Sequence, residues 1–196
     1  GIMIDISHPS AESMKQMVQL SEAPIIASHS SARALCNHSR NLSDEQLLLL
    51  KENGGVVQTV AFSSYLNTEK HEARAAYMKE VNQKIADSLG ISWYDRSMFS
   101  SLTKEQQNEY MVNYPKVSKL ANEMASKDPN APEAVGVTDL VDHIDYMVKL
   151  IGIDHVGISS DFDGGGGIAG WSDASETFNV TLELVKRGYS EEAIAK

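Results

Sequence analysis

The chain has 196 residues, enough for one domain with a sizeable core, and 42% of them are hydrophobic and 22% charged, as in ordinary globular proteins. It carries 17 Lys and Arg against 27 Asp and Glu, which gives a formal net charge of −10. Binding to nucleic acid or to an anionic membrane surface needs clustered positive charge, so this balance argues against both partners. The single cysteine, Cys36, excludes an intramolecular disulfide and a cysteine-based zinc cluster.

The sequence does not decide the compartment, and bacterial cytoplasm, periplasm and secretion all stay open. No apolar run reaches the ~18 residues that a membrane span needs. Strand-like sequence follows Gly1 immediately, and Lys196 falls inside a predicted helix. We therefore expect both ends of the chain to continue into a longer polypeptide.

Short apolar runs alternate with amphipathic segments along the chain. In chain order they predict a strand at 2–6, a helix at 10–20, a strand at 25–28, a helix at 43–53, a strand at 55–62, a helix at 68–89, a helix at 139–151, a strand at 155–159, and helices at 174–187 and from 190 onward. The expected caps are Ser10, a capping box from Ser43 to Gln46, and Thr138.

The alternation is interrupted between residues 66 and 137. After the polar helix at 68–89 the patterning is weak, apart from a second capping box at 103–106 and a turn cluster at 128–132. We interpret 66–137 as a helical insertion that could cover a site as a lid or mediate contact between subunits.

The resulting order is β-α-β-α-β, a helical insertion, and then α-β-α. Continuous apolar strands are typical of a parallel sheet that is buried on both faces. Two α/β architectures fit this order: an open doubly wound sheet, or part of a parallel (β/α)8 TIM barrel, of which four strands are half. In either case residues 1–196 form a single domain that contains the insertion.

Three of the predicted strands end in residues suited to metal or acid–base chemistry, namely His8, His29 and Asp161. Functional groups of both architectures lie at the carboxyl ends of the strands. Parallel neighbours lie ~4.8 Å apart, so the two imidazoles could converge on one zinc ion at ~2.0–2.1 Å each. Asp161 could accept a proton from a metal-bound water or bind a substrate ammonium. The alternative is that the histidines are unrelated loop residues and that Asp161 only braces its loop.

The remaining candidates are interpreted as structural or solvated. His38 lies in the loop after His29 and could touch a ligand, but a solvated role is expected. Cys36 is expected to be buried because nothing evident activates it as a nucleophile. The glycines at 164–167 lack the Lys-Ser/Thr and the G-x-G-x-x-G spacing of nucleotide loops, so they favour a mobile loop at a pocket mouth. Structural roles are expected for three more histidines: His71, His143 and His155.

Five blocks of this sequence, in the same order, closely resemble the renal (membrane) dipeptidase family of zinc peptidases. The blocks are residues 4–10, 24–36, 40–47, 141–145 and 153–164. The insertion at 66–137 is the least diagnostic part, and it looks more like the bacterial branch of the family than the animal one.

The resemblance implies a (β/α)8 barrel related to the amidohydrolases, with two zinc ions bridged by a glutamate and a hydroxide, and hydrolysis of dipeptides as the activity. His8 and His29 match two histidines that bind one of the zinc ions. Arg40 matches an arginine that binds the substrate carboxylate, for which a guanidinium is suited because it can bind bidentately. Asp161 matches an aspartate that contacts the substrate amine and the catalytic water, and Tyr65 matches a tyrosine of the pocket.

Other parts of the family pattern are absent from this chain: a His-x-Asp pair, the bridging glutamate and a further substrate-binding histidine, all from the N-terminal half. We therefore expect this chain to form strands five to eight of a barrel and to retain two ligands of one zinc ion. Alone it is expected to be inactive, with zinc absent or only partly bound. Its open strand edges predict a homo-oligomer or pairing with the missing half. Two rivals stay open: another amidohydrolase-like metal hydrolase, acting on cyclic amides or esters, and a non-catalytic binding module that has lost its metals. Arg40, as a carboxylate anchor, favours the dipeptidase.

Overall fold

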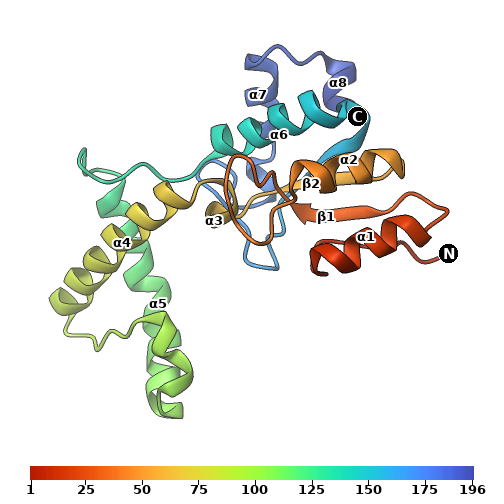
Figure 1. The fold of residues 1–196 in the computed structure, drawn as a ribbon. Helices are drawn as coiled ribbons and strands as arrows, with labels where there is room; N and C mark the ends of the chain where they lie inside the picture. The colour runs from red at the N-terminus through yellow and green to blue at the C-terminus, as the bar shows by residue number, and fades with distance from the viewer. The chain divides into compact units, whose positions relative to one another are not determined.

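The computed structural model describes all residues from 1 to 196 and contains one three-stranded parallel sheet (Figure 1). Its strands are β1 (Ile26–Ser30), β2 (Val56–Val60) and β3 (Val156–Ser159), and they neighbour one another in chain order. Both pairs are parallel, as expected for apolar strands that are separated by helices. The carboxyl ends of all three strands therefore lie at one edge of the sheet.

The first predicted strand is present only as a short extension of this sheet. Asp5 forms a single parallel bridge with Ile26, and the N–H of Ile6 donates to the Ile26 carbonyl at 2.8 Å. The N–H of Ile26 in turn donates to the Ile4 carbonyl at 3.0 Å. The strand predicted at residues 2–6 is therefore shorter than expected. The apolar side chains at its start do not pack in the core, and Ile2 is 98% exposed.

Helices pack in chain order against the sheet. α1 (Ala11–Leu20) contacts α2 (Asp44–Glu52), α2 contacts α6 (Val137–Ile151), and α6 contacts α7 (Phe178–Lys186). α2 and α6 contact each other and both contact β2, so they lie on the same face of the sheet.

The starts of the first two helices confirm the predicted caps. The Ser10 hydroxyl accepts a hydrogen bond from the N–H of Ser13 at 3.2 Å. At α2 the Ser43 hydroxyl accepts from the N–H of Gln46, and the Gln46 side chain accepts from the N–H of Ser43. These side chains satisfy amides that have no partner within the helix, which is why the helices begin at these residues.

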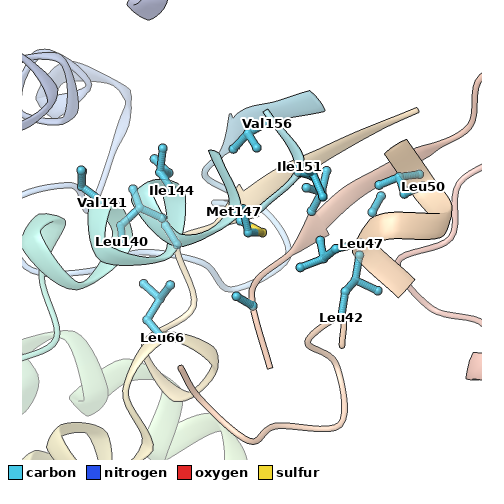
Figure 2. Packing of buried hydrophobic residues seen from close by; sticks show 14 of the residues in the cluster. Leu42, Leu47, Leu50, Leu66, Leu140, Val141, Ile144, Met147, Ile151 and Val156 are labelled. Atoms are coloured by element: carbon cyan, nitrogen blue, oxygen red, sulfur yellow. The ribbon is translucent and has the colours of Figure 1, made fainter. Parts of the chain in front are cut away.

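The hydrophobic core lies between the helices and the sheet (Figure 2). α6 supplies a large share of it because its apolar residues recur on one face. Burying a side chain of this size contributes about 1.5–3 kcal/mol. Fully buried members of the cluster include Leu47, Leu50, Val57, Leu140, Val141, Met147 and Ile151.

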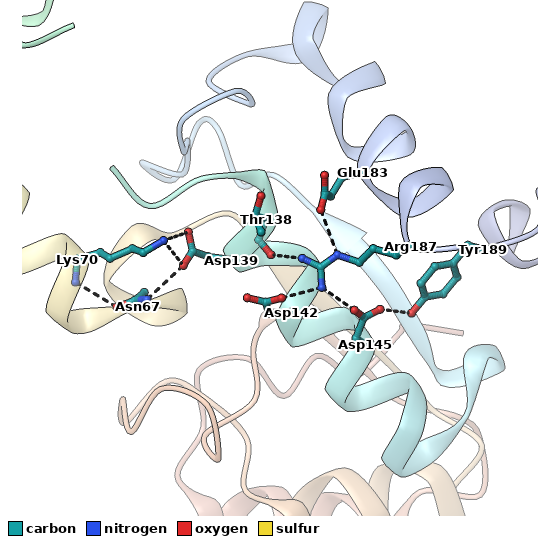
Figure 3. A network of polar contacts seen from close by, with 9 residues as sticks. All are labelled: Asn67, Lys70, Thr138, Asp139, Asp142, Asp145, Glu183, Arg187 and Tyr189. Carbon is teal, nitrogen blue, oxygen red and sulfur yellow. Dashed lines mark hydrogen bonds and ion pairs between the residues drawn. The ribbon is translucent and has the colours of Figure 1, made fainter. Parts of the chain in front are cut away.

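The start of α6 differs from the prediction that Thr138 caps it. Its N-cap is Gly136, whose N–H donates to the Asp139 carboxylate at 3.0 Å. A carboxylate in the first turn satisfies an orphan amide and faces the positive end of the helix dipole. Asn67 and Lys70 also donate to Asp139, so the same carboxylate attaches residues 67–70 to the start of α6 (Figure 3).

A second polar network joins the C-terminal segment to α6 (Figure 3). Arg187 donates to Asp142 and to Asp145 at 2.6 Å each, and to Glu183 at 3.1 Å. The Tyr189 hydroxyl donates to Asp145 at 2.7 Å. These contacts fix the end of α7 on the polar side of α6.

Several short elements were not predicted or have different bounds. The helix expected at 174–187 is divided into a 3-10 turn and α7. His155 lies in a 3-10 turn before β3, one residue outside the strand predicted to begin with it. The short elements are α3 (Ser63–Leu66), η2 (Ile153–His155), η3 (Ala174–Glu176) and α8 (Glu191–Ala195).

The chain divides into two compact units: residues 1–71 with 134–196, and residues 72–133. The second unit contains most of α4 (Thr68–Leu89), which has the predicted bounds, and all of α5 (Lys104–Ala125). None of the helices is long and apolar enough to cross a membrane.

α5 is the largest element that the sequence patterning did not predict. Its capping box at Thr103 and Gln106 is present as expected, but the helix then continues for 22 residues with Pro115 inside it. Aromatic side chains provide part of the packing of this unit: the Tyr110 ring lies 5.1 Å from that of Trp93. The 3-10 turn η1 (Arg96–Ser101) connects the segment after α4 to α5.

Candidate active site

The carboxyl edge of the sheet brings together residues from three separate segments. His8 follows the Asp5 bridge, His29 lies in the last part of β1, and Asp161 comes two residues after β3. Parallel strands in chain order place these positions along one edge of the sheet, with β2 between the strands that carry His29 and Asp161.

The two histidines meet at their Nε2 atoms. These atoms lie 2.8 Å apart, and the ring centroids are 4.8 Å apart with an interplanar angle of 59°. Two nitrogens bound to one tetrahedral zinc at ~2.0–2.1 Å each would lie about 3.3 Å apart, so a small widening of the pair would fit the ion. No group of three or more His, Cys, Asp or Glu side chains converges anywhere in the chain. The spacing of the pair is therefore compatible with two ligands of one metal ion.

Arg40 lies beside the histidine pair. Its Nη2 is 3.3 Å from Nε2 of His8 and 3.2 Å from Nε2 of His29, and its Nε donates to the Ser7 carbonyl at 3.2 Å. The loop after β1 thus places a cation directly beside both imidazoles. A guanidinium only donates hydrogen bonds, so this position suits it to bind an anion beside the histidine pair.

Tyr65 forms the wall next to Arg40. Its hydroxyl accepts a hydrogen bond from Nη1 of Arg40 at 3.4 Å, and the guanidinium carbon lies 5.6 Å from the centre of its ring. The ring itself stacks between those of His38, at 4.3 Å, and Phe62, at 4.9 Å. His38 is half-buried in this stack and its Nδ1 accepts from the N–H of Arg40, which corrects the expectation that it is simply solvated.

Asp161 is the only residue other than glycine with a positive φ, at 50°. Its carbonyl accepts hydrogen bonds from the N–H groups of Gly164 and Gly166 at 3.0 and 2.8 Å. A side chain at Gly166 would collide with the main-chain oxygens of Ser160 and Asp161, so the tight return of this loop requires glycine there. Non-glycine residues in this conformation concentrate at functional sites, where the surrounding structure holds them in place.

The charges around His29 act on its pKa in opposite directions. Burial lowers this pKa most, and the nearby His8 and Arg40 lower it further, whereas Asp161 and Asp5 oppose them. The result is a pKa below the ordinary value, so the imidazole is neutral near pH 7. A neutral ring is the form in which histidine binds a metal ion.

Asp5 connects the segment carrying His8 to the strand carrying His29. Its carboxylate accepts four hydrogen bonds, from the N–H and the hydroxyl of Ser7 and from the N–H and the hydroxyl of Ser28. Burial raises the pKa of Asp5, but these hydrogen bonds outweigh it and lower the pKa below its usual value. The sequence did not reveal this role, although an aspartate inside an otherwise apolar run was a signal of it.

His143 and Cys36 lie outside this cluster. Nδ1 of His143 accepts from the N–H of Ala32 at 3.0 Å and its Nε2 donates to the Leu66 carbonyl at 2.9 Å, so the buried ring joins the loop after β1 to α3. Cys36 is buried, and its sulfur lies 3.1 Å from the Thr68 hydroxyl. Both positions agree with the structural roles expected of them.

The two other histidines also contact structural partners. Nδ1 of His155 donates to the Gly55 carbonyl at 2.8 Å, and Nδ1 of His71 lies 2.8 Å from the Ser63 hydroxyl.

Paired imidazoles, an adjoining guanidinium and a strand-end aspartate on a parallel α/β sheet are the arrangement of a candidate metal-dependent hydrolase. The sequence model of the membrane dipeptidase family, peptidase family M19, matches residues 1–196, and the chain belongs to this family. The members that resemble it are dipeptidases of a metallopeptidase family.

Two curated relatives illustrate the match. Dipeptidase aclJ of Aspergillus oryzae is 29% identical over 97% of this chain and 31% of its own length. Dipeptidase 3 of Rattus norvegicus is 28% identical over 99% of this chain and 27% of its own length. The chain thus spans about a third or less of these relatives.

Solved structures agree with this assignment. The probable dipeptidase PvdM from Pseudomonas aeruginosa is 37% identical, with a TM-score of 0.65 over 99% of this chain and 47% of PvdM. A Rhodobacter sphaeroides metallopeptidase, solved with a phosphinate mimic of the dipeptide L-Ala-D-Ala, has a TM-score of 0.63 at 22% identity and shows the shared fold.

Proposed function

We propose that this chain forms the C-terminal part of a zinc-dependent dipeptidase that hydrolyses small dipeptides. The observation that carries the proposal is the convergence of the Nε2 atoms of His8 and His29 beside Arg40. A metal-binding pair next to a carboxylate-binding cation suits a substrate with a free C-terminus close to the bond that is cleaved.

The sheet is proposed to be half of a (β/α)8 barrel, strands five to eight. Its strands follow one another in chain order, whereas a doubly wound sheet reverses order at a switch point. The successive contacts of α1, α2, α6 and α7 also favour a barrel, because its helices form one outer layer. The insertion at 66–137 is proposed to act as a lid or as a subunit contact.

His8 and His29 are proposed to hold one of two zinc ions. Bound zinc supplies Lewis-acid activation of water and of the scissile carbonyl. His29 is suited to this role because its lowered pKa keeps it neutral, and its Nε2 faces the same point as that of His8.

Three residues are proposed to act on the dipeptide. Arg40 binds its carboxylate through the guanidinium, whose orientation the Tyr65 hydroxyl and the Ser7 carbonyl fix. Asp161 binds the substrate ammonium and accepts a proton during hydrolysis. The opposing influence of Asp161 on the pKa of His29, which it raises, supports a position of this carboxylate near the histidine pair.

The chain alone is proposed to be inactive. A catalytic zinc site needs about three protein ligands, and this chain brings only two histidines together. The missing ligands would come from the other half of the barrel, which would also cover the unpaired edges of the sheet. Without that half the chain is expected to self-associate through these edges.

Metal analysis combined with a hydrolysis assay tests the proposal. The chain alone and the whole protein would each be assayed for zinc content and for cleavage of Ala-Ala and of its C-terminal amide. We expect the whole protein to contain zinc and to cleave the dipeptide far better than the amide, and the chain alone to cleave neither.

Variants separate the proposed roles. H8A and H29A in the whole protein should lower zinc content, whereas H71A, a half-buried histidine bonded to Ser63, serves as the control that retains zinc. Turnover by the chain alone would contradict its incompleteness. A zinc-loaded whole protein that ignores dipeptides would instead favour another amidohydrolase-like hydrolase.

A further inference from the structure

The ring of His29 is attached from behind to Asp5 through a serine. Nδ1 of His29 lies 2.8 Å from the Ser28 hydroxyl, which donates a hydrogen bond to the Asp5 carboxylate. The backbone of His29 is attached in a parallel way, because its N–H donates to the Ser7 hydroxyl at 3.0 Å and that hydroxyl donates to Asp5 at 2.9 Å. One carboxylate therefore positions both the ring and the main chain of His29.

The directions of these hydrogen bonds follow from the number of protons available. An ionised carboxylate can only accept, so the hydroxyl of Ser28 donates its single proton to Asp5. The Ser28 oxygen must then accept from His29, and the proton of the neutral imidazole resides on Nδ1. Nε2 keeps its lone pair, and it is Nε2 that faces His8 and Nη2 of Arg40.

We propose that Asp5 and Ser28 are positioning residues that hold His29 in the Nδ1-protonated tautomer, in which Nε2 is presented to a divalent metal ion. The inference rests on the proposed function, since it takes His29 as a metal ligand. Neither residue contacts the substrate; both act through the imidazole. The second nitrogen of a metal-binding histidine commonly donates to such a partner, whose loss lowers metal affinity about 10- to 100-fold.

The variant D5N makes the proposal specific. Oδ1 of Asp5 accepts three hydrogen bonds, from the N–H and hydroxyl of Ser7 and from the N–H of Ser28, so an asparagine must keep its oxygen there. Its amide nitrogen then faces the Ser28 hydroxyl and donates to it. That frees the serine proton to point at His29, which forces the imidazole proton onto Nε2 and blocks the metal-binding position.

The test reads the tautomer directly in the whole protein after its metal has been removed. Long-range 1H–15N spectra at about pH 8, where the imidazole is neutral, distinguish a protonated Nδ1 from a protonated Nε2. We expect His29 to be Nδ1-protonated in the wild type and Nε2-protonated in D5N. A wild-type His29 protonated on Nε2, or a D5N variant with an unchanged tautomer, overturns the proposal.

A matched control and a second variant guard against a folding defect. Asp173 accepts from the N–H and hydroxyl of Ser175, as Asp5 does from Ser7, but has no histidine behind it, so D173N should leave the His29 spectrum unchanged. If D5N does not fold, S28A retains the Asp5–Ser7 bonds and should lose the preference for Nδ1. A pure Nδ1-protonated signal in S28A would refute the role of the serine.

Titration with Zn2+ adds the functional measurement. The whole protein should lose about 10- to 100-fold in zinc affinity in D5N and none in D173N. Equal affinity in D5N and wild type would overturn the positioning role. A wild type that binds no zinc would refute the proposed metal site, and the tautomer measurement would still decide the hydrogen-bond assignment separately.

Discussion

Replacing His143 by leucine should destabilise the fold severely, although the residue lies outside the candidate site. Leucine roughly matches its volume but removes both hydrogen bonds of the buried ring, which leaves the N–H of Ala32 and the carbonyl of Leu66 without partners. An unsatisfied buried polar group costs about 1–3 kcal/mol, so the two together cost about 2–6 kcal/mol. The free energy of unfolding of a typical domain is only about 5–15 kcal/mol, so H143L should lose a large part of its stability.

The pH dependence of stability provides an independent check on the same residue. Burial lowers the pKa of His143 below 6.5, so as the pH falls below this value the unfolded chain binds a proton that the native state refuses. Wild-type stability should therefore decrease with falling pH from about 6.5 down to the native pKa, by up to about 1.4 kcal/mol per pH unit from this residue. H143L should lack the part of the pH dependence that comes from His143. In this pH range it should keep the parts that come from His29 and His38, whose pKa values are also lowered.

Urea unfolding followed by circular dichroism, at pH 5.5 and pH 8, measures both effects. The control is H71L, because the Ser63 partner of His71 is part-buried and can reach water, so the loss should stay within about 0.5 kcal/mol. A loss below about 1 kcal/mol in H143L at pH 8, or a pH dependence equal to that of the wild type, would refute the assigned hydrogen bonds and tautomer.

Three further predictions concern the substrate cation, the glycine loop and the polar network on α6. R40A in the whole protein should lower kcat/KM for Ala-Ala about 10- to 100-fold, mainly through KM, and should barely affect the C-terminal amide; equal losses on both substrates would argue against a carboxylate contact. G166A should destabilise the chain by about 1–3 kcal/mol in thermal unfolding, because the added methyl group meets the main-chain oxygens of Ser160 and Asp161, and an unchanged Tm would show that the loop adapts freely. R187Q should lower the free energy of unfolding by about 1–2 kcal/mol at low ionic strength and by less in 1 M salt, since it removes the ion pairs to Asp142, Asp145 and Glu183. A loss that does not depend on salt would point to packing instead.

Local signals in the sequence predicted the regular elements well. Capping boxes at Ser43 and Thr103 begin helices where expected, and the bounds of α4 agree with its pattern. These features succeed because a cap or a helical period depends on residues within a few positions of each other. The failures have two different causes. Residues 2–6 lack a strand partner for most of their length, which a local pattern does not reveal. At α6 the cap is Gly136 rather than Thr138 because Asp139, three residues further on, accepts from its N–H, a local contact that the usual preference for threonine at a cap concealed.

The sequence of α5 contains a helical pattern of apolar residues, but the pattern is weak. Its buried residues Val117, Ala121 and Ala125 recur every four positions, which is a helical period. Two of the three are alanines and Pro115 precedes them, so the apolar signal is weak and a helix breaker stands within it. The helix is packed in part by aromatic side chains from outside it, such as Trp93, which a local window does not connect to it.

The sequence by itself determined the α/β alternation, the parallel strands, the family and the residues that deserve testing at the strand ends. The tertiary structure decided how those residues meet: that the Nε2 atoms of His8 and His29 face each other, that Arg40 lies beside both, and that Asp5 stands behind His29. It also determined the tautomer of His143, whose Nδ1 accepts from Ala32 and whose Nε2 donates to Leu66. The physical reason is that a tautomer depends on which donors and acceptors surround the ring, and these come from distant segments: 111 positions separate Ala32 from His143.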